Sequence, residues 1–295
     1  MAHCYHRRQQ GSKGRLATEG ERCYARGMKG WRMARAALRT IFHTALVLGP
    51  AAGLLLSQSL HWRLVFGAAT LVGVALIIWA GFVYIPGFDP FFRVPWRGPR
   101  RGRRLAITFD DGPNGAFTEE VLELFRRHGG KATFFMVGQS VEREPELARR
   151  VLAEGHAVGS HTYSHQKLHR LSRAEMVSEV ERGHACLEAA GINGSRLFRA
   201  PHGLKTFALV RHLTRRGIRL IGWTDGVYDT DCPSAEIIAA RALKKLRPGE
   251  ILLLHDGKQG HDRRPMVAAL DTILAACRER RLEPVTVPEL LDGAR

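Results

Sequence analysis

From Leu105 onward, short apolar runs alternate with longer segments of helical periodicity, and this alternation leaves few folds open to the chain. Short apolar runs that end at glycine, proline or aspartate are typical of buried strands. Because strands separated by helices usually pair in parallel, the pattern predicts an α/β protein of about seven parallel strands, closed or nearly closed into a barrel. The strands are expected at 105–109, 132–137, 157–160, 197–199, 218–223, 251–255 and 283–286.

Two apolar stretches precede this region. Leu64 to Ile85 is a run of 22 residues without a charge, long enough to cross a hydrocarbon core of about 30 Å. The stretch from Thr40 to Ser59 is a weaker candidate, because it contains His43 and Pro50. We therefore expect one or two transmembrane helices, arranged as a hairpin over residues 40–86 where both cross.

The positive charge is concentrated before the folded region. Residues 1–104 hold 17 Lys and Arg against 3 Asp and Glu, whereas residues 105–295 hold 28 against 25. The nearly neutral folded part lacks the basic face that duplex binding requires, so nucleic acid is not an expected partner and a membrane surface is. We interpret residues 1–39 as a basic disordered segment and residues 87–104, with six arginines, as a basic interfacial linker.

These features predict an integral protein of the plasma or inner membrane. Ten basic residues precede the first apolar stretch, Arg63 lies between the two stretches, and six arginines follow the second. Basic flanks tend to remain in the cytoplasm, so two spans would keep both ends of the chain there. A single span would instead place the folded part outside.

Polar residues follow several expected strands, where the active sites of parallel α/β folds lie. Asp110 and Asp111 end the first strand, and two adjacent carboxylates are typical of metal or acid–base sites, although Asp before Gly-Pro is also common in turns. His161 and His165 are four residues apart, a spacing that lets two imidazoles reach one ion. Further candidates after later strands are Arg199, Asp225, Asp229, Asp231 and His255.

Taken together and in order, the motifs TFDDGP, HTYSH, RAPHG, a Trp-to-Asp segment at 223–229, and LLLHD resemble the polysaccharide deacetylase family of NodB-homology carbohydrate esterases. The resemblance covers about residues 104–290. It implies that residues 105–295 form a catalytic domain with a distorted (β/α) barrel. It also implies removal of N-acetyl or O-acetyl groups from a polysaccharide or lipid-linked glycan that contains amino sugars.

The resemblance assigns roles to individual residues. A divalent metal, commonly zinc, is held by Asp111, His161 and His165. Such a set leaves coordination positions open for a water and the substrate carbonyl. Asp110 is the expected base, oriented by Arg199, and His255 is the expected acid, with Asp229 as its partner. The expected substrate-binding residues are Pro201, His202, Gly203, Trp223 and Leu253.

The chain departs from the family pattern at two points. It has Thr230 where many members have Trp after the fourth-motif aspartate, and RAPHG where RPPYG is usual. The first change leaves Asp225 and Asp231 open as alternatives to Asp229. Trp223 also ends an apolar run, which is typical of a core residue.

Two other functions remain open on the sequence. Two histidines and a carboxylate also form the facial triad of Fe(II) oxygenases, and a membrane-tethered sugar-binding protein without activity could retain the fold. An oxygenase does not need Asp110, Arg199 and His255 around the triad. No obligate protein partner is implied.

Overall fold

The computed structural model describes residues 60–84, 91–231, 233–257 and 262–292. The described strands form one sheet in the order β5-β4-β3-β2-β1-β7-β6, with β8 paired to β1, and every pair is parallel. The predicted α/β class is confirmed. The strands are β1 (Arg104–Asp110), β2 (Thr133–Met136), β3 (Ala157–Ser160), β4 (Leu197–Phe198), β5 (Arg219–Leu220), β6 (Asp225–Gly226), β7 (Ile251–His255) and β8 (Glu283–Val285).

The sheet is strongly curled, because its two edge strands are consecutive in the sequence. Laid flat, β5 and β6 would be six strand spacings apart, about 29 Å. The chain from Leu220 to Asp225 spans at most about 17 Å. The two edges must therefore approach each other, although no β5–β6 pairing is found among the described residues. The fold is a curled, open form of the expected barrel.

The run predicted as one strand over 218–223 is in fact divided. β5 ends at Leu220, and the Gly222 N–H then donates to the carbonyl of Pro95 at 2.7 Å. Thr224 N–H donates to Ile251 beside β6. Ile221 N–H still donates to Phe198 of β4, but the donors after it bond to Pro95 and to β7. The run therefore ends as β5, and a separate strand, β6, follows beside β7.

The segment predicted as an interfacial linker packs in part on the domain. Val94 is buried, Gly98 N–H donates to the Gly249 carbonyl at 2.8 Å, and Arg97 pairs with Glu250 at 2.8 Å. The packed chain therefore includes residues that precede Leu105.

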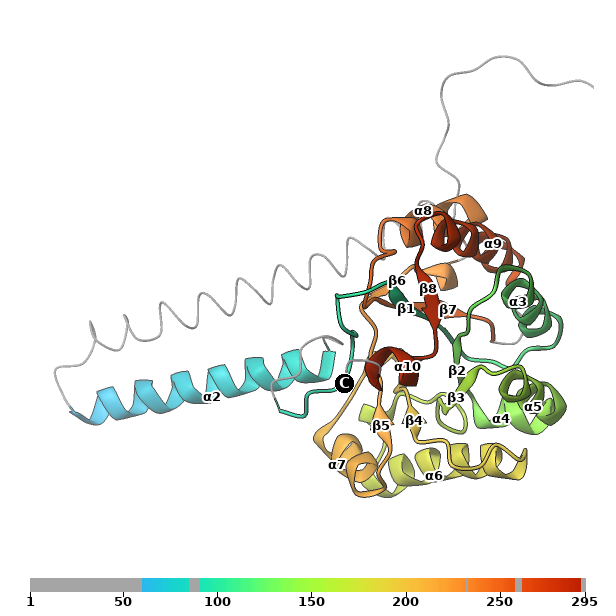
Figure 1. The fold of residues 1–295 in the computed structure, drawn as a ribbon. Helices are drawn as coiled ribbons and strands as arrows, with labels where there is room; N and C mark the ends of the chain where they lie inside the picture. The colour runs from blue at the N-terminus through green and yellow to red at the C-terminus, as the bar shows by residue number, and fades with distance from the viewer. Residues whose placement is uncertain (1–59, 85–90, 232, 258–261, 293–295) are drawn as a thin grey trace, which may run out of the picture.

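Helices cover the outside of the sheet (Figure 1). A capping box begins the helix at Arg173, because Ser172 Oγ accepts from Glu175 N–H and the Glu175 carboxylate accepts from Ser172 N–H. Thr206 caps α7 by accepting from Leu209 N–H. The helices are α3 (Gly115–His128), α4 (Gly138–Arg143), α5 (Pro145–Ala153), α6 (Arg173–Ala189), α7 (Phe207–Arg215), α8 (Ala235–Leu243), α9 (Arg264–Glu279) and α10 (Val287–Asp292).

Helix α2 (Leu60–Tyr84) projects away from the domain (Figure 1). Within the described residues it is the one helix long and apolar enough to cross a membrane, over Leu60–Val83. It covers most of the span predicted from Leu64 but begins at Leu60, so Arg63, expected between the two stretches, lies in the first turn of the helix. The weaker predicted stretch, 40–59, lies outside the described residues.

Candidate functional site

The two aspartates at the end of β1 both face His161 Nε2, at 3.7 Å each, because the backbone turns between them. Successive residues of a strand point to opposite faces, but Asp111 has φ 73°, in the left-handed region, and breaks this alternation. A Cβ added to Gly257 would lie 1.9 Å from the Asp111 carbonyl oxygen. The close approach of residue 257 to this turn thus requires glycine, and both carboxylates are held almost fully buried.

Asp111, His161 and His165 offer three donor atoms within 4.8 Å of one another. His165 Nε2 lies 3.1 Å and His161 Nε2 3.7 Å from Asp111 Oδ1, a buried oxygen without a hydrogen-bond partner among the described residues. The Arg199 carbonyl faces His161 Nδ1 at 2.8 Å, which leaves Nε2 directed at the carboxylate. Burial and the neighbouring His165 lower the pKa of His161 to about 3 against the opposing charge of Asp111, so its imidazole is neutral near pH 7. This donor set fits a divalent cation.

Arg199 follows β4 and is fully buried. Its Nη1 donates to Asp110 Oδ1 at 2.8 Å and to Thr108 Oγ1 at 2.7 Å, while Nη2 donates to the Gly222 carbonyl at 3.1 Å. The guanidinium also lies over the Phe135 ring, 4.1 Å from its centre. These contacts fix the Asp110 carboxylate on its Oδ1 side, and Oδ2 lies 3.7 Å from His161 Nε2.

His255 ends β7 directly beside Asp110, its partner in the β1–β7 register. Asp229 Oδ1 lies 2.9 Å from His255 Nδ1, and Oδ2 accepts from the His255 backbone N–H at 2.9 Å. Burial alone would lower the pKa of His255. The charge and hydrogen bond of Asp229, with smaller contributions from Asp111 and Asp110, outweigh burial and raise it to about 9.

Of the three aspartates left open by the sequence, the structure brings Asp229 to His255. Asp229 lies in a 3-10 turn, Asp229–Asp231, and its side chain is buried. Asp231, at the other end of this turn, is exposed. The Asp225 side chain lies outside the described part of the structure.

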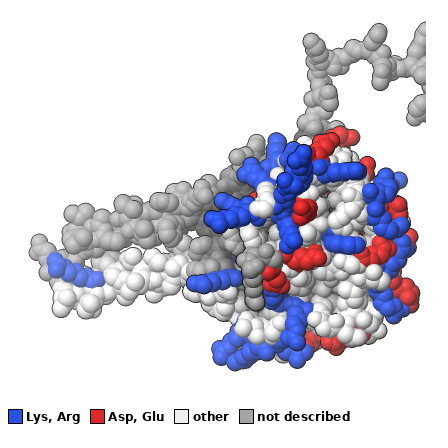
Figure 2. All heavy atoms as spheres, viewed as in Figure 1, with Lys and Arg blue, Asp and Glu red and all other residues white. Residues whose placement is uncertain are grey.

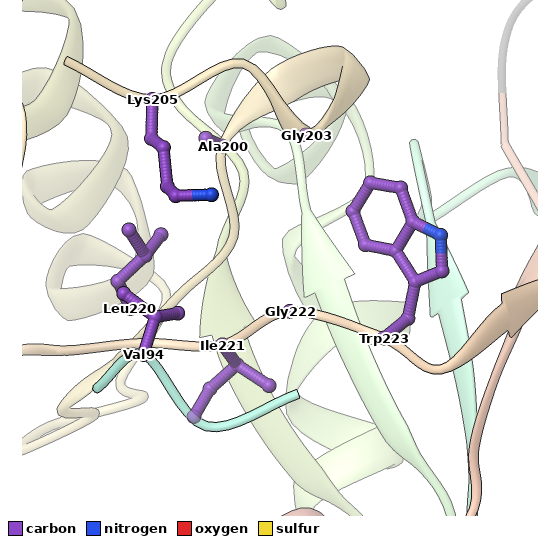
Figure 3. A pocket seen from close by; sticks show the side chains of 8 residues that line it. All are labelled: Val94, Ala200, Gly203, Lys205, Leu220, Ile221, Gly222 and Trp223. Atoms are coloured by element: carbon purple, nitrogen blue, oxygen red, sulfur yellow. The ribbon is translucent and has the colours of Figure 1, made fainter. Parts of the chain in front are cut away.

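The predicted substrate-binding residues come from three separate segments of the chain. Pro201–Gly203 form a 3-10 turn in which His202 has φ 58° and its ring centre lies 4.8 Å from that of His165. Leu253 lies two residues before His255 on β7 and shares its side of the strand. Gly203 and the half-buried Trp223 line a small hollow, with Lys205 opposite the indole (Figure 3). Its volume of about 10 Å³ suits one water and is too small for a sugar ring.

Backbone strain is concentrated around the same centre. Of the seven non-glycine residues with positive φ in the described chain, five are in these loops. Such conformations cost free energy and persist where the surrounding structure enforces them, often at functional sites. The five are Asp111, Thr162, His165, His202 and Tyr228.

The sequence did not indicate the residue that holds the loop between the two histidines. Glu179 of α6 accepts from Ser164 N–H at 2.9 Å and from Ser164 Oγ at 2.8 Å, and its carbonyl accepts from Tyr163 N–H at 3.0 Å. Within the loop, Thr162 Oγ1 accepts from His165 N–H. A charged residue on the buried side of α6 is the one sequence signal that could have pointed to this role.

A second contact missed by sequence reasoning supports the turn after Asp111. Asp256 is fully buried and Thr118 Oγ1 donates to its Oδ2 at 2.6 Å, while the same hydroxyl accepts from Asn114 N–H. Burial raises the pKa of Asp256 to about 7. Asp256, the aspartate of the LLLHD motif, is therefore bound to the first turn of α3. This helix starts at Gly115, just after the Gly112-Pro113 turn.

Comparison with known proteins gives a consistent result. The family model for polysaccharide deacetylases matches residues 97–221. A peptidoglycan-N-acetylglucosamine deacetylase of Bacillus cereus is 36% identical over 205 residues, which cover 69% of this chain and 95% of the relative. A chitooligosaccharide deacetylase of Bradyrhizobium is 34% identical, over 64% and 90% of the two chains.

Solved structures agree with this result. A peptidoglycan N-acetylglucosamine deacetylase superposes with a TM-score of 0.65 and 29% identity, over 68% of this chain and 94% of that one. The superposed fold contains the parallel, curled sheet described above. This chain belongs to the polysaccharide deacetylase family, hydrolases that act on carbon–nitrogen bonds of polysaccharides.

Proposed function

We propose that this protein is a metal-dependent deacetylase that removes acetyl groups from the amino sugars of a glycan. The observation that carries the proposal is the meeting, at one edge of the sheet, of a three-donor cation site with Asp110 on β1 and His255 on the neighbouring strand β7. The relatives are named for deacetylation of N-acetylglucosamine polymers and chitooligosaccharides, which supports the same substrate class. A membrane-anchored position is part of the proposal, since α2 has the length of a span.

Asp111, His161 and His165 would hold the divalent ion, for which zinc suits two imidazoles and one carboxylate. When bound, the ion polarises the acetamide carbonyl and lowers the pKa of the attacking water. Because His161 is neutral near pH 7, it need not lose a proton to bind the ion.

Asp110 accepts the proton of the water as its oxygen attacks the carbonyl carbon. Arg199 keeps the carboxylate in place through its 2.8 Å hydrogen bond. His255, charged near pH 7, gives its proton to the amide nitrogen as the C–N bond breaks, because an amine is a poor leaving group as an anion. The products are acetate and a free amino sugar.

The test is acetate release from an N-acetylglucosamine oligomer by the full chain loaded with zinc. We expect Asp110→Asn and His255→Ala to lower kcat by at least about 100-fold with metal content unchanged, because each removes a proton-transfer group. Asp111→Asn and His161→Ala should instead lose metal.

Two outcomes would contradict this proposal. A variant Asp110→Asn that retains zinc and near-wild-type kcat would remove Asp110 from the role of base. An activity that requires iron and consumes oxygen, without acetate release, would indicate a facial-triad oxygenase in place of a deacetylase.

A further inference from the structure

One end of α2 is embedded in the catalytic domain. Phe82 is fully buried and Val83 nearly so, in a cluster with Phe198 of β4 and Leu209 of α7. Upstream, the apolar side chains of α2 are largely exposed, and Leu71 is the most exposed of them. The helix therefore enters the domain at a fixed place, while the rest of it is not covered by the described protein.

Three further phenylalanines surround that place. The rings of Phe91 and Phe92 lie 5.7 and 5.8 Å from Phe82, and the ring of Phe207, at the start of α7, lies 4.7 Å away. Their outer sides remain exposed, at 49%, 38% and 39%. We call Phe91, Phe92 and Phe207 the aromatic collar. Exposed aromatic surface at the base of an apolar helix indicates that the collar contacts an apolar environment.

Basic residues continue the same face. Arg93 follows the collar and is exposed, and Arg211, one helical turn after Phe207, is exposed on the same side of α7. The opposite side of α7, with Leu209 and Leu213, is buried in the domain. Lys and Arg side chains are seen beside the base of α2 and over α7 (Figure 2).

We propose that the aromatic collar and the exposed side of α7 rest in the interface of the bilayer that α2 crosses. The apolar rings would lie at headgroup depth, with Arg93 and Arg211 against anionic phosphates. The 24 residues of the candidate span are about 36 Å long, so a hydrocarbon core of about 30 Å ends close to the collar. The inference rests on the membrane span included in the proposed function.

This orientation would bring the active site close to the membrane. Lys205 Nζ lies 5.0 Å from the centre of the Phe82 ring. Lys205 is three residues, at most about 10 Å, from His202 beside the cation site. A glycan attached to a lipid of the same bilayer would therefore lie within reach of the site, which narrows the proposed substrate class to membrane-anchored glycans.

Photo-crosslinking of the full chain in vesicles of phosphatidylethanolamine and alkyne-tagged phosphatidylglycerol tests the surface directly. Benzoyl-phenylalanine is placed at Phe91 or Phe207, at Leu71 in the middle of α2, and at Leu152, an exposed residue of α5 outside the collar. We expect lipid adducts at residues 71, 91 and 207, each at least about tenfold more abundant than at residue 152.

The other crosslinking outcomes overturn the inference in distinguishable ways. Adducts at residue 71 but none above the residue 152 level at 91 and 207 would leave the span intact and reject the membrane face. Protein adducts at 91 and 207, including a dimer of this chain, would assign the collar to a protein interface. No lipid adduct at residue 71 would reject the span and the inference together, while acetate release from a soluble oligomer would still test the deacetylase itself.

The substrate consequence has a separate test. The triple variant Phe91→Ser, Phe92→Ser, Phe207→Ser is compared with Leu152→Ser on chitotetraose, free in solution or attached to a lipid in the vesicles. We expect the triple variant to lose about tenfold in kcat/KM on the anchored substrate and less than about twofold on the free one, as proximity is lost. Equal losses on both substrates would indicate a folding effect, and unchanged values would show that the collar does not orient the site.

Discussion

The contact between Asp229 and His255 makes a prediction about pH. His255 must be protonated to act as the acid, so activity falls as the pH rises through its pKa, which Asp229 and the other carboxylates raise to about 9 against the effect of burial. Asn cannot supply the negative charge. We therefore expect Asp229→Asn to move the alkaline limb of the kcat profile to lower pH by at least about one unit.

The control for this prediction is Asp231→Asn, because Asp231 is exposed at the other end of the same turn. A bound cation lowers the pKa of His255 in every variant, so the profiles are compared at equal zinc loading. If the limb stays in place in Asp229→Asn and moves in Asp225→Asn, the role belongs to Asp225.

Single residues show where sequence reasoning succeeds and where it stops. Asp110, Asp111, His161 and His255 follow apolar runs, so their placement at strand ends could be predicted locally. The choice among three aspartates after β5 could not be predicted, because all three follow the same run. The choice depends on the short turn Asp229–Asp231, which directs the Asp229 carboxylate at the backbone N–H and the ring of His255 on β7.

At the scale of elements, α6 supports the metal site without contributing a donor. Ser164 lies between His161 and His165 and donates two hydrogen bonds to the Glu179 carboxylate. The variant Glu179→Ala removes both acceptor oxygens. We expect the zinc dissociation constant of Glu179→Ala, measured by chelator competition on the apo protein, to be about 10- to 100-fold higher than that of the wild type. Glu179→Gln should lie closer to the wild type, because an amide can accept from Ser164 N–H and donate to Oγ.

Glu181→Ala is the matched control for α6. Glu181 is two residues away on the same helix and pairs with His212 and Arg216 near the surface. Its zinc affinity should equal that of the wild type. A Glu179→Ala protein that melts like the wild type and binds zinc within about twofold of it would show that the loop does not need this carboxylate.

The elements missed from the sequence are short or depend on distant partners. The strands at 157–160 and 251–255 have the expected bounds, since each is a short, mostly apolar run that ends in a polar residue and is mostly buried on both faces. β6 has two residues, too few for a periodic signal, and exists because β7 lies beside it. The break after Leu220 depends on Pro95, more than a hundred residues earlier, which no local pattern could indicate.

At the scale of the whole molecule, charge predicts the side of the membrane on which the active site lies. Ten Lys and Arg in residues 1–39 precede the apolar region, Arg63 alone lies within it, in the first turn of α2, and six arginines lie in residues 93–104. Basic flanks of this length resist translocation, so both sets are expected in the cytoplasm and the chain is expected to cross twice. The catalytic domain would then meet lipid-linked glycans at the inner leaflet, whose anionic lipids suit Arg93 and Arg211.

Fusions of alkaline phosphatase, which is active only outside the cytoplasm, test this topology in intact cells. We expect a fusion after Arg295 to be inactive and a fusion after Trp62, in the first turn of α2, to be active, because two spans place that end of α2 outside. The active fusion shows that the reporter is exported and folded, so the inactive one can be interpreted. The reverse pattern would mean a single span with the domain outside, and the substrate would then be a glycan of the outer face.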